Sequence, residues 1–174
     1  TKLKDLLNSI LTSETKDLNI LDLGVGSGLL GENLKPYAKT LIGVDLSQKM
    51  LDIAKDKNVY DELKKQEIIE YLKVNNNTFD LIIAGDVLPY FGCLKDLFKY
   101  LNKNLSETGH IILSIEKNNF DDFKLQSTGR FSHNPSYLEN LASSNGLKLK
   151  ELKDVELRSH KDTIIDGALI TFHK

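Results

Sequence analysis

A stretch of glycines at every second position is the feature that most constrains the fold of this chain. Residues 19–31 read NILDLGVGSGLLG, an apolar run interrupted by Asp22 and followed by Gly24, Gly26 and Gly28. Glycine adopts positive φ angles easily and lets the backbone approach a ligand closely, so this pattern is typical of a buried strand that turns sharply into a helix. We predict a loop that holds a nucleotide-type cofactor.

The glycines can be read in two registers, which predict different cofactors. From Gly26 the loop reads Gly-x-Gly-x-x-Gly, the fingerprint of NAD or FAD binding. From Gly24 it reads Asp-x-Gly-x-Gly-x-Gly, which resembles the first motif of the class I S-adenosylmethionine-dependent methyltransferases. A dinucleotide pyrophosphate favours a helix N-terminus without a competing negative charge, whereas Asp22 suits the ammonium group of S-adenosylmethionine. The second register is therefore favoured, and an ordinary glycine-rich turn is the alternative that needs no ligand.

A second short apolar run, residues 40–45, leads to the next acidic candidate. It ends in Asp45, about twenty residues after the glycines, where a carboxylate can accept hydrogen bonds from both hydroxyls of a ribose. Ser47 can then cap a helix whose apolar positions begin at Met50. We therefore predict that Asp45 binds the ribose of the cofactor.

Two motifs together resemble those of a known enzyme family. The residues LDLGxGxG at 21–28, followed by GVDLSxxML at 43–51, are similar to small bacterial methyltransferases of types 11 and 12. Further along, YDEL at 60–63, FDLIIAGDVL at 79–88 and GRFxH at 129–133 resemble the methyltransferase domain of predicted TPR-containing methyltransferases. The resemblance covers nearly the whole chain, although no TPR array is present in this sequence.

This resemblance implies S-adenosylmethionine as the cofactor and S-adenosylhomocysteine as the product. In the family an acid at the end of the third strand meets the adenine amino group, and Glu67 stands there, followed by Ile68, whose N–H can pair with the ring. The alternative for Glu67 is a surface residue that opens the next helix. The residues that we expect at the cofactor are Asp22, Gly24, Val25, Gly26, Gly28, Asp45, Leu46, Met50, Glu67, Ile68 and Gly85.

The alternation of apolar runs and amphipathic stretches predicts an α/β fold with a parallel sheet, in one domain over residues 1–174. We expect strands at 18–24, 40–45, 63–67, 79–85 and 109–115, and helices that begin near residues 3, 27, 47, 68, 94 and 134. Two further stretches, 147–157 and 164–172, indicate an antiparallel pair with a bulge. The resemblance implies a three-layer, Rossmann-like class I methyltransferase fold with seven strands in the order 3-2-1-4-5-7-6.

The segment after the fourth strand predicts the acceptor site, because ligands of open α/β sheets bind at the carboxyl ends of the strands. It reads GDVLPY at 85–90, whereas methyltransferases acting on amino groups of adenine or glutamine carry Asn/Asp-Pro-Pro-Tyr here, so we discount that acceptor class. The aperiodic segment 116–133 is long for a plain connection and predicts a substrate cover, with a merely variable loop as the alternative. The candidates for a general base are His133, Asp86 and Tyr90, each of which also has a purely structural alternative.

Composition narrows the choice of partner. With 23 basic and 25 acidic residues the formal net charge is −2, which gives no overall attraction to nucleic acid or to an anionic membrane. Cys93 is the only cysteine, which excludes an internal disulfide framework and a cysteine-cluster metal site. Apolar runs are much shorter than the roughly 20 residues of a membrane span, and no signal-peptide pattern is present. We therefore expect a cytoplasmic protein that acts on a small molecule.

The sequence favours an S-adenosylmethionine-dependent methyltransferase that moves a methyl group to a small-molecule acceptor by in-line displacement. Two alternatives stay open. One is an S-adenosylmethionine-binding module without activity, attached to a larger protein. The other is an NAD-dependent oxidoreductase, which Asp22 and the last two predicted strands make less favoured. The chain begins at Thr1 rather than with methionine, so a missing N-terminal lid segment stays open as well. Neither the acceptor atom nor the oligomeric state follows from the sequence.

Overall fold

The computed structural model describes residue 7 and residues 16–160 and 163–174, with only the backbone of 157–160, 163 and 164. The helix predicted from residue 3 lies outside the described residues apart from Leu7, which is buried.

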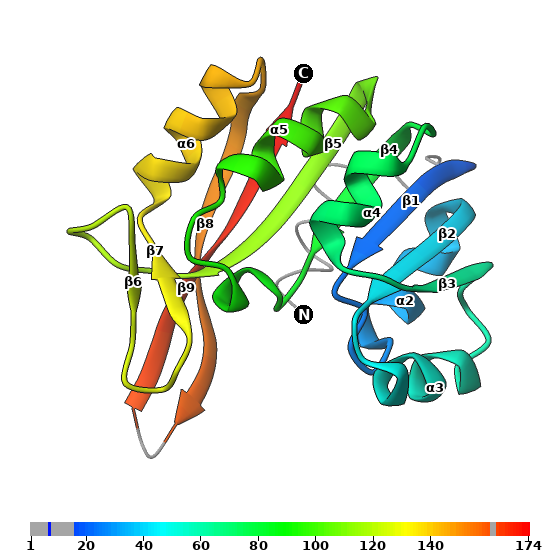
Figure 1. Cartoon of the computed structure of the whole chain (residues 1–174), viewed down its shortest axis with the longest axis horizontal. Coiled ribbons are helices and arrows are strands. Elements are labelled where there is room, and N and C mark those ends of the chain that lie inside the picture. The colour runs from blue at the N-terminus through cyan, green and yellow to red at the C-terminus, as the bar shows by residue number, and fades with distance from the viewer. Residues whose placement is uncertain (1–6, 8–15, 161–162) are drawn as a thin grey trace.

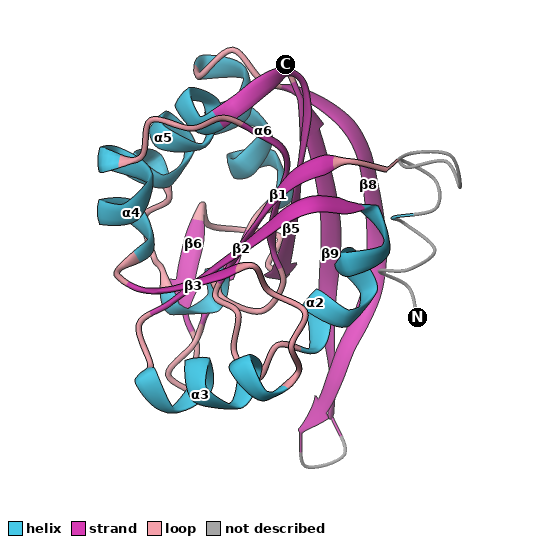
Figure 2. Cartoon of the chain, turned by 90° about the vertical axis from the view of Figure 1, so that its right-hand side faces the viewer, coloured by secondary structure: helices cyan, strands magenta, loops and turns pink. Residues whose placement is uncertain are grey.

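A twisted sheet runs through the molecule, and helices α4, α5 and α6 cover one of its faces (Figure 1). The view turned by 90° shows α2 on the opposite side of the sheet (Figure 2). The described chain therefore has the expected layered arrangement.

Strands and helices alternate along the chain as far as β5, after which a short hairpin and one helix precede two long strands. The strands are β1 (Leu18–Leu23), β2 (Ala38–Asp45), β3 (Glu62–Lys65), β4 (Phe79–Ala84), β5 (Leu105–Glu116), β6 (Phe123–Leu125), β7 (Phe131–His133), β8 (Lys148–His160) and β9 (Thr163–His173). The helices are α2 (Leu29–Leu34), α3 (Gln48–Asp56), α4 (Ile68–Val74), α5 (Lys95–Asn104) and α6 (Pro135–Ser144), with two 3-10 turns, η1 (Lys35–Tyr37) and η2 (Leu88–Tyr90).

The large sheet has the strand order β3-β2-β1-β4-β5-β9-β8. Strands β1 to β5 are parallel, and β9 is antiparallel to both of its neighbours. This is the predicted order 3-2-1-4-5-7-6, because β8 and β9 are the sixth and seventh strands of this sheet. The predicted Rossmann-like α/β fold is therefore confirmed. The register of β8 against β9 shifts at two places, which agrees with the bulge expected there.

Apolar layers pack on both faces of the sheet. Successive residues of a strand point to opposite faces, so the two layers receive alternate side chains. On β1, Leu21 and Leu23 join the cluster under α4, α5 and α6, whereas Ile20 joins the cluster that contains Leu34 of α2. By the same alternation Asp22 points to the α2 face, where it is fully buried. The strand pattern thus decides where the first acidic residue of the glycine motif points.

Polar side chains fix the starts of two predicted helices. At the start of α3, the Ser47 hydroxyl accepts a hydrogen bond from the Met50 N–H at 3.4 Å. At the start of α6, the Asn134 side chain accepts one from the Ser136 N–H at 3.0 Å. Helix α2 differs, because Gly28 precedes it with a φ of 78° and contributes no side-chain cap. Both polar caps confirm predicted helix starts.

Two predicted segments differ in detail from the structure. The third strand covers Glu62–Lys65 rather than residues 63–67, because Glu67 leaves the strand and caps α4 by accepting a hydrogen bond from the Glu70 N–H at 2.9 Å. The aperiodic segment 116–133 contains an antiparallel hairpin of β6 and β7. Each of these strands has only three residues, too few to show a period in the sequence.

Candidate active site

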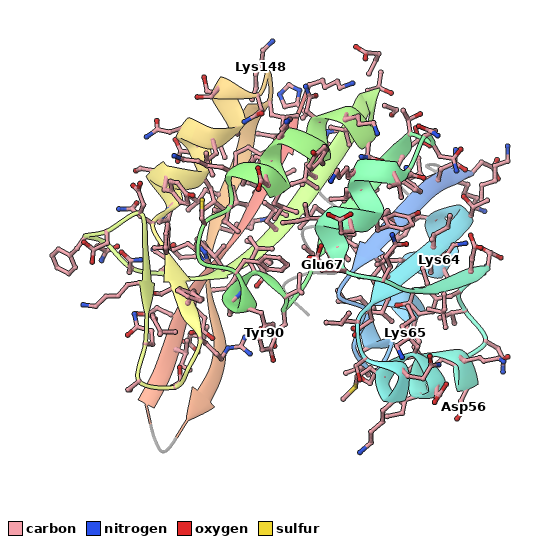
Figure 3. All side chains as sticks on the ribbon, viewed as in Figure 1. Asp56, Lys64, Lys65, Glu67, Tyr90 and Lys148 are labelled. Carbon is pink, nitrogen blue, oxygen red and sulfur yellow. The ribbon has the colours of Figure 1, made fainter. Side chains whose placement is uncertain are left out.

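A cavity of about 1310 Å³ opens at the carboxyl ends of β1, β2 and β4, where open α/β sheets bind their ligands. Pockets for one small ligand typically have roughly 300–1000 Å³, so this cavity has room for more than one. The glycine-loop end is lined by residues 24–27, 45–47, 50 and 66–68. The β4–β5 end is lined by residues 29, 30, 85–87, 90, 91, 114, 155, 156 and 169. Glu67 and Tyr90, labelled in Figure 3, belong to these two ends.

The glycine loop turns sharply because three of its residues have positive φ angles. These are 74° at Gly24, 53° at Gly26 and 78° at Gly28. A Cβ atom on Gly24 would lie 2.5 Å from the Cβ of Val87, so a side chain at Gly24 is excluded by packing as well as by φ. A Cβ atom on Gly26 would meet nothing within 4 Å. The loop is therefore packed at its first glycine and open to the cavity at its second.

Asp45 ties this loop to the end of β2. One of its carboxylate oxygens accepts a hydrogen bond from the Gly26 N–H, and the other accepts one from the Ser47 N–H, both at 2.8 Å. An ionised carboxylate has about four acceptor positions, so each oxygen can accept a further hydrogen bond. Asp45 lines the cavity. It can therefore hold the loop and a ligand at the same time.

Asp22 does not line the cavity, in contrast to its predicted contact with an ammonium group. Its side chain is fully buried behind the loop, where one oxygen accepts a hydrogen bond from the Tyr60 hydroxyl at 2.7 Å. The other oxygen has no partner among the described residues. Burial raises the pKa of Asp22 to about 6, an effect that the hydrogen bond from Tyr60 partly offsets. Burial and the adjacent Asp22 also raise the pKa of Tyr60, so its hydroxyl stays a donor.

Of the other predicted cofactor residues, all but Gly28 line the cavity. Gly28 also lies outside the cavity wall, and a Cβ atom there would lie 3.1 Å from Ala54 of α3. The other predicted residues line the cavity: Gly24, Val25, Gly26, Asp45, Leu46, Met50, Glu67, Ile68 and Gly85. The structure therefore brings nine of the eleven predicted cofactor residues together in the cavity wall, whereas Asp22 and Gly28 lie outside it.

The β4–β5 end is walled mostly by apolar side chains that the sequence reasoning missed. Phe91 follows η2, Val155 comes from β8, and Leu169 comes from β9. Ser114, near the end of β5, adds a hydroxyl group to this wall. Strands β5, β8 and β9 were predicted, but only their register shows which of their residues face the cavity. Leu29 and Leu30 also line this end, and their position directly after the glycines was the one signal available in the sequence.

Arg130 of the β6–β7 hairpin holds several groups at the β4–β5 end. Its guanidinium donates to Glu116 at 2.7 Å, to Asp86 at 2.5 Å and to the Tyr90 hydroxyl at 3.1 Å. It also lies 4.9 Å from the centre of the Tyr90 ring. The Glu116 side chain is only 6% exposed, whereas that of Asp86 is 68% exposed. The segment predicted as a substrate cover therefore contacts two of the three predicted general-base candidates.

His133, the third candidate, is corrected by the structure. Its side chain is fully buried, and it does not line the cavity. The Nε2 atom lies 3.1 Å from the Gly92 carbonyl oxygen, and because a carbonyl only accepts, Nε2 carries a proton and donates it. Burial lowers the pKa of His133, although contacts with backbone carbonyls oppose this shift. His133 fastens the hairpin to the loop before α5, and it cannot reach a substrate in the cavity.

Within the described ranges, residue 7 with 16–160 and 163–174, no group of three or more His, Cys, Asp or Glu side chains is placed to hold a metal ion. Among the helices that the structure describes, none is both long enough and apolar enough to cross a membrane.

Comparison with known families decides the enzyme class. The sequence model of a methyltransferase domain family matches residues 21–113, more than half of the chain. The chain belongs to this family of methyltransferase domains. Together with the relatives and solved structures described next, the match confirms the predicted class, an S-adenosylmethionine-dependent methyltransferase of a small molecule, and its predicted cofactor. It also favours the register that begins at Gly24 over the dinucleotide register.

This methyltransferase is similar to several known proteins. It is 25% identical over 166 residues to the ubiquinone biosynthesis O-methyltransferase of Coxiella burnetii. The aligned region covers 84% of this chain and 70% of the relative. Its fold is similar to that of the magnesium protoporphyrin IX methyltransferase of Synechocystis PCC 6803, which was solved with bound SAH. The TM-score is 0.76 and the sequence identity is 17%, and the match covers 98% of this chain and 80% of that one. The YcgJ protein of Bacillus subtilis gives a TM-score of 0.77 and 18% identity over 100% of this chain and 99% of that one.

Proposed function

We propose that this methyltransferase binds S-adenosylmethionine at the glycine-loop end and methylates an oxygen atom of a small, mainly apolar acceptor at the β4–β5 end. The observation that carries the proposal is that both ends belong to one cavity. The name of the Coxiella burnetii relative, an O-methyltransferase, supports an oxygen acceptor. The net charge of −2 supports a small molecule rather than a nucleic acid.

The residues of the glycine-loop end fit the cofactor. The open side of Gly26 leaves room for a ligand against the backbone, and the spare acceptor positions of Asp45 suit the two ribose hydroxyls. Met50 and Ile68 offer apolar surface on which an adenine ring can lie. Glu67, although it caps α4, lines the cavity where the adenine amino group is expected. When bound, S-adenosylmethionine supplies a methyl group on a positively charged sulfur.

The chain's own contribution to methyl transfer is alignment. The reaction requires the acceptor oxygen, the methyl carbon and the leaving sulfur in one line, and the apolar wall of the β4–β5 end restricts the acceptor to that approach. In this transfer the acceptor oxygen would take the methyl group while the sulfur would keep the electron pair of the bond that it loses, so the chain has to hold the acceptor in place and receive its proton. We assign the proton lost by the acceptor to Asp86, whose exposed carboxylate can pass it to water. Tyr90, held by Arg130, serves as part of the wall.

Isothermal titration tests the cofactor, with S-adenosylhomocysteine as the ligand and NAD as the parallel control. We expect saturable binding of S-adenosylhomocysteine alone, and binding of NAD alone would contradict the proposal. Incubation with S-adenosylmethionine and a panel of matched phenols and anilines should then give methylated phenols, detected by mass spectrometry together with S-adenosylhomocysteine.

Binding without any product across this panel would instead favour the alternative of a non-catalytic module within a larger protein. The likeness to the domain of TPR-containing methyltransferases and the cytoplasmic location stay predictions.

A further inference from the structure

Ser114 is a buried hydroxyl at the β4–β5 end of the cavity. It lies on β5, is only 5% exposed and lines the cavity. In the part of the chain that the structure describes, its hydroxyl makes no hydrogen bond. The surrounding wall of the cavity is mainly apolar.

The strand register shows that the Ser114 side chain points into the cavity. Its neighbour Leu113 pairs with Ala84, the last residue of β4, so Ser114 lies beside the point where the chain leaves β4 for Gly85. Across the other edge, Ser114 pairs with Leu169 of β9. Side chains of directly paired residues share a face of the sheet, and Leu169 also lines the cavity. The hydroxyl is therefore aimed at the space expected for the acceptor.

The Ser114 hydroxyl faces the cavity, so water can hydrate it when no ligand is bound. An apolar ligand that displaces this water leaves the hydroxyl without a hydrogen bond, which is unfavourable. A ligand that hydrogen-bonds to Ser114 replaces the lost contact. Because a hydroxyl both donates and accepts, it matches the hydroxyl of a phenol or an alcohol, which has the same two capacities.

We propose that Ser114 is a specificity-determining residue that hydrogen-bonds a hydroxyl group of the acceptor. The inference rests on the proposed function, because it assigns the β4–β5 end to the acceptor. Ser114 selects hydroxyl-bearing molecules over apolar molecules of the same shape, and it fixes how such a molecule lies against Leu30 and Leu169. No proton transfer is assigned to it.

Thr171 offers a matched control for Ser114. It lies on β9, paired with Ile112, and therefore on the same face of the sheet as Ser114. Its hydroxyl is also buried and has no partner among the described residues. Thr171 does not line the cavity. Thr171→Val thus removes a buried, unpartnered hydroxyl that no acceptor in the cavity can touch.

The experiment is an isothermal titration of protein saturated with S-adenosylhomocysteine, using 4-propylphenol and its deoxy analogue propylbenzene. The wild type should bind the phenol more tightly. Ser114→Ala should weaken phenol binding roughly two- to tenfold, the value of one hydrogen bond, without weakening propylbenzene binding. Ser114→Thr, which keeps a hydroxyl, should restore the preference for the phenol, and Thr171→Val should leave both affinities as in the wild type.

Three results would overturn the inference. The first is a phenol preference that is the same in the wild type and in Ser114→Ala. The second is an equal loss in Ser114→Ala and Thr171→Val, which indicates a general effect of disturbing the sheet. The third is a wild type that binds neither probe while it binds S-adenosylhomocysteine. Failure to bind S-adenosylhomocysteine at all would contradict the proposed function itself, and this inference with it.

Discussion

The two ends of the cavity are built by different means. The glycine-loop end is made by the backbone of the loop and by side chains, among them Asp45 and Glu67, that lie at or just after the ends of the next two strands of the chain. Asp45 accepts hydrogen bonds from the Gly26 and Ser47 N–H groups. The β4–β5 end is made by side chains from β5, β8 and β9, from helix α2 and from the segment that follows β4, which lie far apart in the sequence. A short motif can specify the first end, whereas the second depends on the register of the whole sheet.

Gly24→Ala should have the largest effect, because Gly24 is where the two ends meet. Its φ of 74° is strained for alanine, and the new methyl group would lie 2.5 Å from the Cβ of Val87. Backbone strain and overpacking together should lower the free energy of unfolding by about 3 kcal/mol or more, measured by urea denaturation.

Gly26→Ala is the control, since its added methyl group meets open space and strains only the backbone, by about 1–2 kcal/mol. It should mainly weaken binding of S-adenosylhomocysteine. Val87→Gly in the Gly24→Ala background removes the Val87 Cβ and both Cγ atoms near the new methyl group, so it should recover part of the stability lost to the clash. Equal destabilisation by Gly24→Ala and Gly26→Ala would contradict a packed contact between the two ends.

Asp22→Asn should change how stability depends on pH, because burial raises the pKa of Asp22 to about 6. The folded protein then binds more protons than the unfolded chain between about pH 4 and 6, so the wild type loses stability as the pH rises through this range. The loss is on the order of 3 kcal/mol, from a shift of about two pKa units. Asparagine does not titrate, so Asp22→Asn should lack this loss.

Urea denaturation of both proteins at pH 4, 5, 6 and 7 measures the effect. The stability of the variant relative to the wild type should rise up to about pH 7 and stay constant above it. Asp52→Asn makes the same change at an exposed position of α3 and serves as the control. A constant difference between Asp22→Asn and the wild type at all four pH values would show that Asp22 does not titrate in this range.

Asp45→Ala should weaken binding at the glycine-loop end without a comparable loss of stability. It removes the carboxylate that accepts from the Gly26 and Ser47 N–H groups and, as proposed, from the ribose. We expect a loss of roughly 1.5–3 kcal/mol in the binding of S-adenosylhomocysteine, the range for hydrogen bonds to a charged group. Calorimetry with Asp52→Ala as the charge-matched control checks this, and unchanged affinity in Asp45→Ala would disprove the assignment.

Arg130→Lys should give the smallest effect, confined to the β4–β5 end. Lysine keeps the positive charge near Glu116 but cannot form the planar fork that reaches Asp86 and Tyr90 together. Stability should fall by about 1 kcal/mol, because each lost hydrogen bond is partly exposed. Turnover should slow while the affinity for S-adenosylhomocysteine stays the same. A loss of cofactor affinity equal to that of Asp45→Ala would contradict the separation of the two ends.

The sequence predicted the fold and most of the glycine-loop end because their signals are local. Asp45 follows its strand and precedes its helix cap within a few residues, and the structure places it in the cavity wall. Asp22 was misplaced because a motif does not show which face of a strand a residue points to. The alternation of β1 turned Asp22 toward Tyr60, behind the loop.

The β4–β5 end could not be derived from sequence patterns. Ser114 looks like any polar residue in an apolar strand, and only the pairing of β5 with β9 shows that it faces the cavity. His133 looked reactive because histidine is a common general base, but its neighbours bury it against Gly92. Pairing between distant segments, and the burial that follows from it, carry no signal within a short window of sequence.

The position of β9 has a consequence for how the molecule is made. Strand β9 follows β8 in the chain, yet it lies between β5 and β8 in the sheet. On the ribosome, β8 is therefore synthesised before the strand that joins it to the rest, and the edge of β5 stays unpaired until β9 emerges. Val155 and Leu169 reach the cavity only after this insertion. A nascent chain can thus form the glycine loop early, but it completes the wall of the β4–β5 end only after β9 has been inserted.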